Sequence, residues 1–219
     1  MPTNPVDMFE SRVRGAGRSR PAPTVDEPVS CPERLVLAAC VLACAFVASS
    51  PLSAAGNRTV LSYGDSLSVG TDLFLDGLLR GWSVRSEAVI SRHASDVPPA
   101  LRALGASLPP VIVVSAGTND DPGRVSGFAR IVRETLAAAG PRRCVVWATI
   151  VRPPYQGVSY DGYNRALGAI ARTHANLRVL DWAAMARAHP TWFGRDGVHP
   201  TMTGYRARAA ATARLVQRC

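Results

Sequence analysis

Ser66 lies in the segment GDSLSVG at residues 64–70, directly after a short apolar run. A serine at a strand-to-helix turn lies beside backbone N–H groups that have no acceptor within the helix, and the helix dipole there favours negative charge. That setting suits a developing oxyanion, but it equally suits a serine that caps the helix. Ser66 is therefore either a cap or a nucleophile, and the choice depends on whether the chain supplies a base.

A serine nucleophile needs a base, and the base needs an acid that orients it. Among the four histidines, only His199 has an acid at a working distance, which is Asp196 in the segment DGVHP. Gly197 and Pro200 keep this segment from being helical, so a tight turn is expected to bring the two side chains together. The carboxylate can then accept from one ring nitrogen and leave the other for Ser66. The same spacing also fits a simple capping turn.

The other three histidines are weaker candidates for the base. His174 lies near the end of a predicted helix, where a histidine often meets the last carbonyl groups. His189 precedes a proline in a loop and has no acid beside it. His93 lies in a loop near the predicted site, where it contacts either substrate or solvent.

Asn119, in the segment SAGTNDD at residues 115–121, follows the third predicted strand. A side-chain amide at that place can donate a hydrogen bond to an oxyanion. Asparagine is also a common turn residue, so the turn alone would explain it. Asp65, by contrast, is expected to make a structural hydrogen bond at its turn rather than to take part in catalysis.

Short apolar runs alternate with helical patterns from residue 58 onward. Continuous apolar runs predict buried strands, the alternating pattern at residues 83–90 predicts a further strand, and apolar residues at near-helical spacing predict helices. Gly81 marks a helix end, and Asp121 followed by Pro122 marks a helix start. The predicted strands cover residues 59–63, 83–90, 110–116, 144–150 and 177–182, and the predicted helices cover residues 66–81, 95–106, 122–139, 160–175 and 200–217.

This alternation predicts an α/β fold with a parallel sheet that is covered by helices on both faces. In such sheets the ligand site lies beyond the carboxyl ends of the strands. The segments that follow the first four strands contain Ser66, SRHAS, Asn119 and VRPPYQG, and the fifth strand leads on to Asp196 and His199. The residues able to do chemistry are therefore expected at one edge of the sheet.

Three segments together resemble the motif blocks of the SGNH (GDSL) hydrolase family: GDSL at 64–67, GTND at 117–120 and DGVHP at 196–200. The resemblance covers essentially all of residues 58–219 and is to secreted, actinobacterial-type esterases. It implies a three-layer αβα sandwich with a flavodoxin-like, parallel five-stranded sheet in the order 2-1-3-4-5. It also implies that Ser66 is the nucleophile, His199 the base and Asp196 the partner of that base.

The resemblance further implies an oxyanion hole, and here the sequence departs from the family pattern. The implied donors are the Ser66 N–H, the Asn119 amide and the N–H of a glycine after the second strand. The segment AVISRHASD at residues 88–96 contains no glycine, and Ser91 falls at the expected position. Ser91 retains a backbone N–H, but it lacks the close approach that glycine permits.

The N-terminal part of the chain has a different composition. Residues 1–33 are rich in Pro, Arg, Ser and acids without apolar periodicity, which predicts a disordered segment. Residues 34–55 contain an arginine, a continuous apolar run at 35–48 and a stretch of small residues, which predict a secretory signal cleaved after Ala55. An uncleaved membrane anchor is an alternative, although a span needs about 20 residues. A lipidated Cys40 or Cys44 is another.

The hydrolase domain is thus predicted at residues 56–219, secreted or otherwise outside the cytoplasm. Cys144 and Cys219 are the cysteines that follow the predicted cleavage site. Two cysteines in an exported domain are expected to form one disulfide, and two free thiols are the alternative.

The charge of the chain has two interpretations. The formal net charge is +9, and every basic residue is an arginine. Such charge favours attraction to an anionic wall or to nucleic acid, but no basic run with interleaved aromatics supports nucleic acid. No metal-ligand spacing and no dinucleotide- or phosphate-binding loop is visible, so we predict neither a metal nor a cofactor. We expect a monomer whose partner is a small-molecule ester.

The predicted reaction is hydrolysis of small acyl esters through an acyl-serine intermediate. Export suggests an O-acetylated saccharide or a lipid ester as the substrate class. His93, Trp192 and Phe193 are the predicted substrate-binding residues, although the two aromatic residues fit ordinary packing equally well. Transfer of the acyl group to an alcohol is the alternative reaction. A non-catalytic wall- or saccharide-binding domain, with the site degraded at Ser91, is the alternative of another class.

Overall fold

Five strands form one parallel sheet in residues 58–219: four of them are largely apolar, and β2 is largely polar. In the computed structural model, which describes residues 58–219, the strands are β1 (Thr59–Gly64), β2 (Ser83–Ala88), β3 (Val111–Ser115), β4 (Cys144–Ala148) and β5 (Leu177–Leu180). The strand order is β2-β1-β3-β4-β5, and every neighbouring pair is parallel. The predicted fold class and strand order are therefore confirmed.

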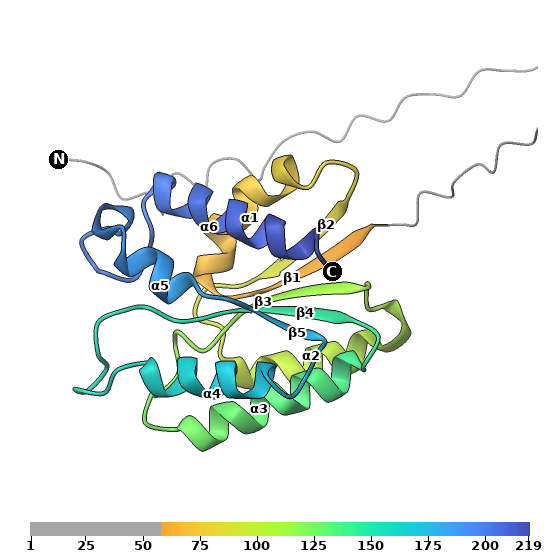
Figure 1. The fold of residues 1–219 in the computed structure, drawn as a ribbon, viewed down its shortest axis with the longest axis horizontal. Coiled ribbons are helices and arrows are strands. Elements are labelled where there is room, and N and C mark those ends of the chain that lie inside the picture. The colour runs from red at the N-terminus through yellow and green to blue at the C-terminus, as the bar shows by residue number, and fades with distance from the viewer. Residues whose placement is uncertain (1–57) are drawn as a thin grey trace, which may run out of the picture. The chain divides into compact units, whose positions relative to one another are not determined.

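Within residues 58–219, six α-helices cover the two faces of this sheet. They are α1 (Ser66–Leu78), α2 (Val97–Leu104), α3 (Val125–Ala139), α4 (Asp161–Ala171), α5 (Trp182–Arg187) and α6 (Met202–Val216). Helices α1, α5 and α6 lie above the sheet in Figure 1, and α2, α3 and α4 lie below it. Short 3₁₀ turns occupy Ala94–Asp96, Gly105–Ser107 and Pro190–Trp192.

The central strands are buried on both faces, because successive side chains point to opposite sides of a strand. In β3, Ile112 and Val114 point to the core between the sheet and helices α2, α3 and α4. Val111 and Val113 point to the core on the other face, between the sheet and helices α1, α5 and α6. This two-sided burial explains why the strands read as continuous apolar runs rather than as alternating ones.

The predicted start of α3 is wrong. The sequence predicted that Asp121 caps a helix whose first residue is Pro122, but α3 begins at Val125. The Asp121 carboxylate accepts a hydrogen bond from the Gly123 N–H at 2.9 Å, and the Arg124 N–H donates to the Asp121 carbonyl. Asp121 therefore closes a separate turn before the helix, as aspartate commonly does.

The predictions for residues 1–33 and for residues 34–55 lie outside the described residues. Among the helices of residues 58–219, none combines the length and the hydropathy that crossing a bilayer requires.

All five strands end at the same edge of the sheet, on the left of Figure 1. The turn that carries Ser66 follows β1, the loop that carries Asn119 follows β3, and the segment that carries His199 lies between α5 and α6. The parallel arrangement thus brings together residues that are far apart in the sequence.

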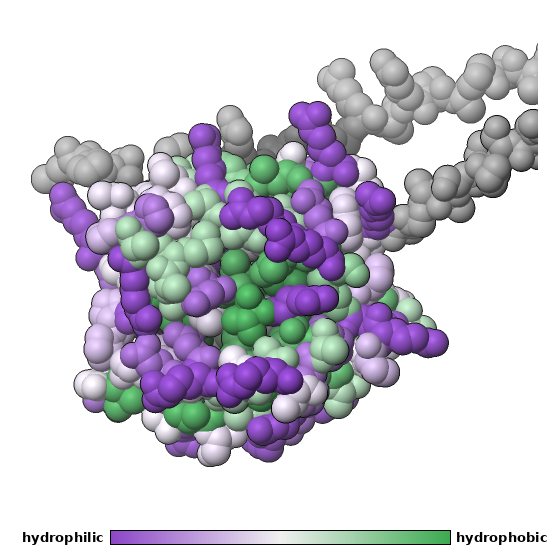
Figure 2. Space-filling view, in the orientation of Figure 1, coloured by the Kyte–Doolittle hydropathy of each residue, from purple (hydrophilic) through white to green (hydrophobic). Residues whose placement is uncertain are grey.

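β5 is an edge strand of the sheet, and its outer side is only partly covered by other elements. Figure 2 shows apolar residues in the middle of this face, between the two helical layers, surrounded by hydrophilic residues. Arg178, the second residue of β5, is exposed. A charged side chain on an edge strand discourages pairing with a further strand.

Helix α1 packs at close range against both α6 and the sheet. A Cβ atom built at Gly70 would lie 2.3 Å from the ring of Tyr205 in α6. A Cβ atom at Gly64, the last residue of β1, would lie 2.2 Å from the Ser68 Oγ atom of α1 and 2.6 Å from the carbonyl oxygen of Ser115 in β3. These distances are shorter than any side chain tolerates, so glycine at these two positions sets how near α1 lies to its neighbours.

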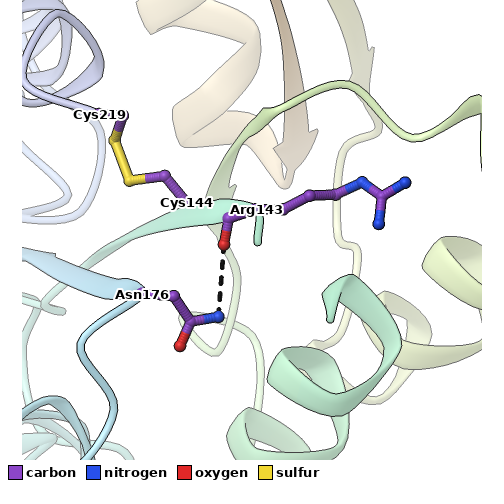
Figure 3. Close-up of a disulfide and its surroundings, with 4 residues drawn as sticks. All are labelled: Arg143, Cys144, Asn176 and Cys219. Atoms are coloured by element: carbon purple, nitrogen blue, oxygen red, sulfur yellow. Dashed lines mark hydrogen bonds between the residues drawn. A yellow bond between two sulfur atoms is a disulfide. The ribbon is translucent and has the colours of Figure 1, made fainter. Parts of the chain in front are cut away.

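A disulfide joins Cys144, at the start of β4, to Cys219, which follows α6 (Figure 3). Beside it, Asn176 Nδ2 donates a hydrogen bond to the carbonyl oxygen of Arg143 at 3.3 Å. Cys219 and Arg58 line the same surface cavity of about 350 Å³. The described chain therefore begins and ends at the edge of the sheet opposite to Ser66.

We predict that Gly70→Ala lowers the free energy of unfolding by about 1–3 kcal/mol, because the added methyl group forces α1 away from Tyr205. Gly77→Ala is the matched control, since a Cβ atom at Gly77 of the same helix meets no atom within 4 Å. It should raise stability by up to about 1 kcal/mol through helix propensity. Urea unfolding followed by circular dichroism measures both changes, and equal midpoints for the two variants would contradict the close-packing argument.

We predict that the double variant Cys144→Ser/Cys219→Ser loses about 2–4 kcal/mol of stability, because the bridge restricts the unfolded chain across a separation of 75 residues. Peptide mass mapping without reduction should find the peptide that contains Cys144 joined to the C-terminal cysteine. Recovery of both cysteines as separately alkylated thiols would disprove the bridge.

Candidate active site

Ser66 is the first residue of α1, but it does not cap the helix. Asp65 does so, because its Oδ1 atom accepts a hydrogen bond from the Leu67 N–H at 3.0 Å. The Ser66 hydroxyl instead lies 2.9 Å from the Nε2 atom of His199. Between the two alternatives for Ser66 that the sequence left open, the contacts thus favour the nucleophile.

Asp196 and His199 come from one tight turn. Asp196 Oδ1 accepts hydrogen bonds from the N–H groups of Val198 and His199, both at 3.0 Å. Gly197 has a φ of +65°, which a glycine adopts without strain. The turn leaves the Oδ2 atom of Asp196 2.6 Å from the Nδ1 atom of His199.

These contacts determine which nitrogen of His199 carries the proton. An ionised carboxylate only accepts hydrogen bonds, so the short contact to Asp196 requires a proton on Nδ1. The Nε2 atom of a neutral ring is then an acceptor, and the Ser66 hydroxyl donates to it. This is the arrangement in which a histidine can take a proton from a serine.

The hydrogen bonds that Asp196 accepts favour its ionised form. Partial burial acts to raise the pKa of Asp196, but hydrogen bonds from the His199 side chain and from the Val198 and His199 amides outweigh it and lower the pKa. The side chains of His199 and Asp196 remain 48% and 50% exposed. The contact between His199 and Asp196 therefore lies at an open surface of the described residues.

The predicted substrate-binding aromatic residues support the turn that carries Asp196 and His199. Trp192 stacks on the rings of His189 and Trp182, and Phe193 packs against Trp182. Phe193 also forms a β-bridge with Pro200, which directly follows the turn. These contacts fit the packing interpretation of Trp192 and Phe193, and contact with substrate stays a prediction.

The loop after β2 carries Ser91 and adjoins the Ser66 turn. The Val89 N–H donates to the Gly64 carbonyl at 2.9 Å. Ser91 has a φ of +63°, a conformation that favours glycine and strains other residues. The backbone at Ser91 thus adopts the conformation of a glycine although the residue is serine.

Asn119 connects the loops after β2 and β3. Its Nδ2 atom donates to the carbonyl oxygen of Arg92 at 3.1 Å. The carbonyl oxygen of Thr118, just before it, lies 2.6 Å from Arg152 Nη1 and 3.1 Å from the Tyr160 hydroxyl. These two contacts hold the Asn119 loop from the side of α4.

His93 forms a second histidine–carboxylate pair near Asn119. Its Nδ1 atom lies 2.8 Å from Asp120 Oδ1, and Asp120 Oδ2 accepts from the Ala94 N–H at 2.9 Å. The His93 side chain is 54% exposed. The Ser66 hydroxyl, however, is bonded to His199, so His93 is not placed as its base.

The remaining histidines meet backbone carbonyl groups. His174 Nδ1 lies 3.0 Å from the Ile170 carbonyl oxygen at the end of α4, as predicted for a histidine in that place. His189 Nδ1 lies 2.9 Å from the Met185 carbonyl oxygen. In residues 58–219, His, Cys, Asp and Glu side chains do not gather in groups of three that could hold a metal ion.

Sequence reasoning missed the residues that support the loops. Arg92 places its guanidinium 3.9 Å from the ring centroid of Tyr63 and donates to the Gly64 and Glu87 carbonyl groups. Arg152 and Tyr160 hold the Asn119 loop. Both arginines lie in segments that directly follow strands, but nothing in their residue type distinguishes them from the chain's other arginines.

The fold is similar to that of several solved structures. The catalytic domain of the peptidoglycan O-acetyltransferase A of Streptococcus pneumoniae has a TM-score of 0.61 and 20% identity, covering 74% of this chain and 93% of that one. A lipolytic protein of the G-D-S-L family from Veillonella parvula has a TM-score of 0.62 and 16% identity, with coverages of 74% and 99%. A family 3 carbohydrate esterase from Clostridium thermocellum has a TM-score of 0.56 and 15% identity, with coverages of 74% and 98%.

No curated protein matches the chain. The family comparison is decisive instead, because one family model aligns with most of the sequence and includes the GDSL segment, the Asn119 loop and the Asp196–His199 turn. Since residues 54–207 match the model of the GDSL-like Lipase/Acylhydrolase family, the chain belongs to this family of ester hydrolases.

Proposed function

We propose that the chain is a serine esterase that hydrolyses small acyl esters, with Ser66 as nucleophile, His199 as base and Asp196 as the acid that orients the base. The observation that carries the proposal is the continuous hydrogen-bonded chain from the Ser66 hydroxyl through His199 to Asp196. Membership of the acylhydrolase family supports the same reaction class.

The first half of the reaction forms the acyl-enzyme. Ser66 Oγ attacks the ester carbonyl carbon while its proton passes to His199 Nε2, and Asp196 stabilises the imidazolium that results. The negative oxygen of the tetrahedral intermediate accepts hydrogen bonds from the Ser66 N–H, the Ser91 N–H and the Asn119 amide. The ester C–O bond then breaks, and the alcohol leaves with the proton from Nε2.

The second half repeats these steps with water. His199 takes a proton from the water molecule, whose oxygen attacks the acyl carbon. The bond between that carbon and Ser66 Oγ then breaks, and the proton returns to the serine. The acid is released and the free enzyme is restored.

The substrate class we propose is an O-acylated saccharide carrying a small acyl group. The exposed triad is compatible with an ester on a bulky alcohol. Two structures of similar fold are a peptidoglycan O-acetyltransferase and a carbohydrate esterase. The export signal predicted at residues 34–55 would bring the enzyme to such substrates outside the cytoplasm.

We predict that Ser66→Ala and His199→Ala each remove nearly all esterase activity, because members of a triad act as a unit. His174→Ala is the matched control, since His174 contacts the Ile170 carbonyl group at the end of α4 and takes no part in the Ser66 contacts. His93→Ala tests the second histidine–carboxylate pair. The measurement is kcat/KM on a panel of esters from acetyl to octanoyl, including an acetylated saccharide, with the melting temperature as a check on folding.

Loss of activity in His93→Ala with activity retained in His199→Ala would refute the assignment of the base. A wild-type protein that hydrolyses no ester and takes no fluorophosphonate label at Ser66 would refute the proposed function. Product analysis in the presence of saccharide acceptors separates hydrolysis from acyl transfer.

We predict that Asn119→Ala lowers kcat by about 10²–10³ with little change in KM, because the amide interacts with charge that develops only in the transition state. Ser91→Gly should leave kcat unchanged or raise it, since it removes only a side chain and relieves the strain of a positive φ. It should also raise the melting temperature. A large loss of kcat in Ser91→Gly with the fold intact would mean that the hydroxyl itself is catalytic.

A further inference from the structure

Arg208 of α6 is a buried charged residue that the proposed reaction does not use. It is 3% exposed, and Asp65, at 0%, is the other charged residue among the buried residues of 58–219. Burial of a guanidinium is unfavourable unless hydrogen bonds and an opposite charge compensate it. Its partners therefore show what the buried charge holds in place.

One hydrogen-bonded route from Arg208 leads to the carbonyl group of Leu67. Arg208 Nη1 donates to the Thr71 hydroxyl oxygen at 3.0 Å. The Thr71 hydroxyl in turn donates to the Leu67 carbonyl oxygen at 2.6 Å. This route fixes the backbone on the C-terminal side of Ser66.

A second route from the same guanidinium leads to the N–H group of Leu67. Arg208 Nη2 donates to the Ser115 hydroxyl oxygen at 3.0 Å, and that hydroxyl lies 3.3 Å from Asp65 Oδ1. Asp65 Oδ1 accepts from the Leu67 N–H at 3.0 Å. The two routes together hold both residues that flank Ser66.

The charges of Arg208 and Asp65 support each other. Burial raises the pKa of the Asp65 carboxyl, and the nearby Arg208 guanidinium acts in the opposite direction. Burial lowers the pKa of Arg208, and the Asp65 carboxylate counteracts it. Removal of either charge alone would leave the other buried without its principal opposite charge.

We propose that Arg208 is a positioning residue for Ser66: through Thr71 and through Ser115 and Asp65, its guanidinium fixes the turn that aims the Ser66 hydroxyl and N–H. The inference rests on the proposed function, because the aim of Ser66 matters for a nucleophile and for an oxyanion donor. The proton directions agree along both routes, since each hydroxyl accepts from Arg208 and donates onward.

The effect on catalysis follows from the geometry. The Ser66 hydroxyl and N–H belong to one residue between two anchored neighbours, so a shift of the turn misplaces the nucleophile and one oxyanion donor together. A misplacement of about 1 Å can lower a rate by about 10²-fold. The misplaced groups act on the bond-forming step, so kcat should fall while KM changes little.

The experiment compares variants of the full chain. Arg208→Met removes the guanidinium and keeps the length of the side chain, and it should lower kcat by about 10²-fold with KM nearly unchanged. Arg208→Lys keeps the charge but cannot donate as a fork to two hydroxyl groups, so it should not restore kcat. Arg206→Met is the matched control, because Arg206 of the same helix is exposed and contacts Phe74 of α1 without joining either route.

Thr71→Val keeps the test valid if Arg208→Met does not fold. It breaks one route while the guanidinium stays in place, and it should lower kcat about tenfold, the effect expected of one hydrogen bond. The second measurement, amide hydrogen exchange, needs no activity. In Arg208→Met or Thr71→Val, exchange should rise selectively in residues 66–69 and remain unchanged in α3.

The outcomes separate the two proposals. Wild-type kcat in Thr71→Val and in folded Arg208→Met overturns the positioning role, as does a loss of kcat that merely follows the fraction of unfolded protein. If the wild-type protein shows no esterase activity, the proposed function fails and hydrogen exchange decides this inference: a selective rise at residues 66–69 supports it, and a uniform rise or none overturns it.

Discussion

The close packing of α1 on α6 is the constraint on which the site depends. Ser66 begins α1, and His199 lies just before α6, so the distance between these helices decides whether the two side chains meet. Gly70 permits that distance, because its missing side chain leaves room for Tyr205. Burial then favours the hydroxyl form of Tyr205, whose pKa rises to about 12, so the helix contact carries no additional charge.

The same contact gives the site its electrostatic character. Helices α1 and α6 both begin at the carboxyl edge of the sheet, so their N-terminal N–H groups are directed to the same region. Negative charge that develops on a substrate there is favoured before any side chain acts. Asp196 stays ionised at the opposite end of the hydrogen-bonded chain, where it favours a positive imidazole.

The strands and the location of the site could be predicted from the sequence, because continuous apolar runs and the residues that follow them are local signals. The strand order came from the family resemblance instead, since periodicity does not specify which strands are neighbours. The start of α3 was predicted wrongly because Asp121 can cap a helix or close a turn, and only the contacts around Gly123 and Arg124 distinguish the two.

The supporting residues could not be predicted from residue type. The sequence YRARAAATAR offers three arginines in one Ala-rich helix, of which Arg208 alone is buried. Its spacing of four from Gly204 and of four from Thr212, both buried, is the signal that would have found it, because such residues share one face of a helix. The positive φ of Ser91 has no local signal at all, since serine rarely adopts it.

The positions of the two ends of residues 58–219 have a consequence for how the fold is encoded. Arg58 and Cys219 line one cavity, whereas residues 154–157 form an exposed stretch between β4 and α4. A circular permutation of residues 58–219 that links Cys219 to Arg58 and opens the chain within that stretch would cut no helix or strand. The histidine would then precede the serine in the polypeptide, although neither would move in space. The order of the motifs along the gene is therefore independent of the geometry of the site.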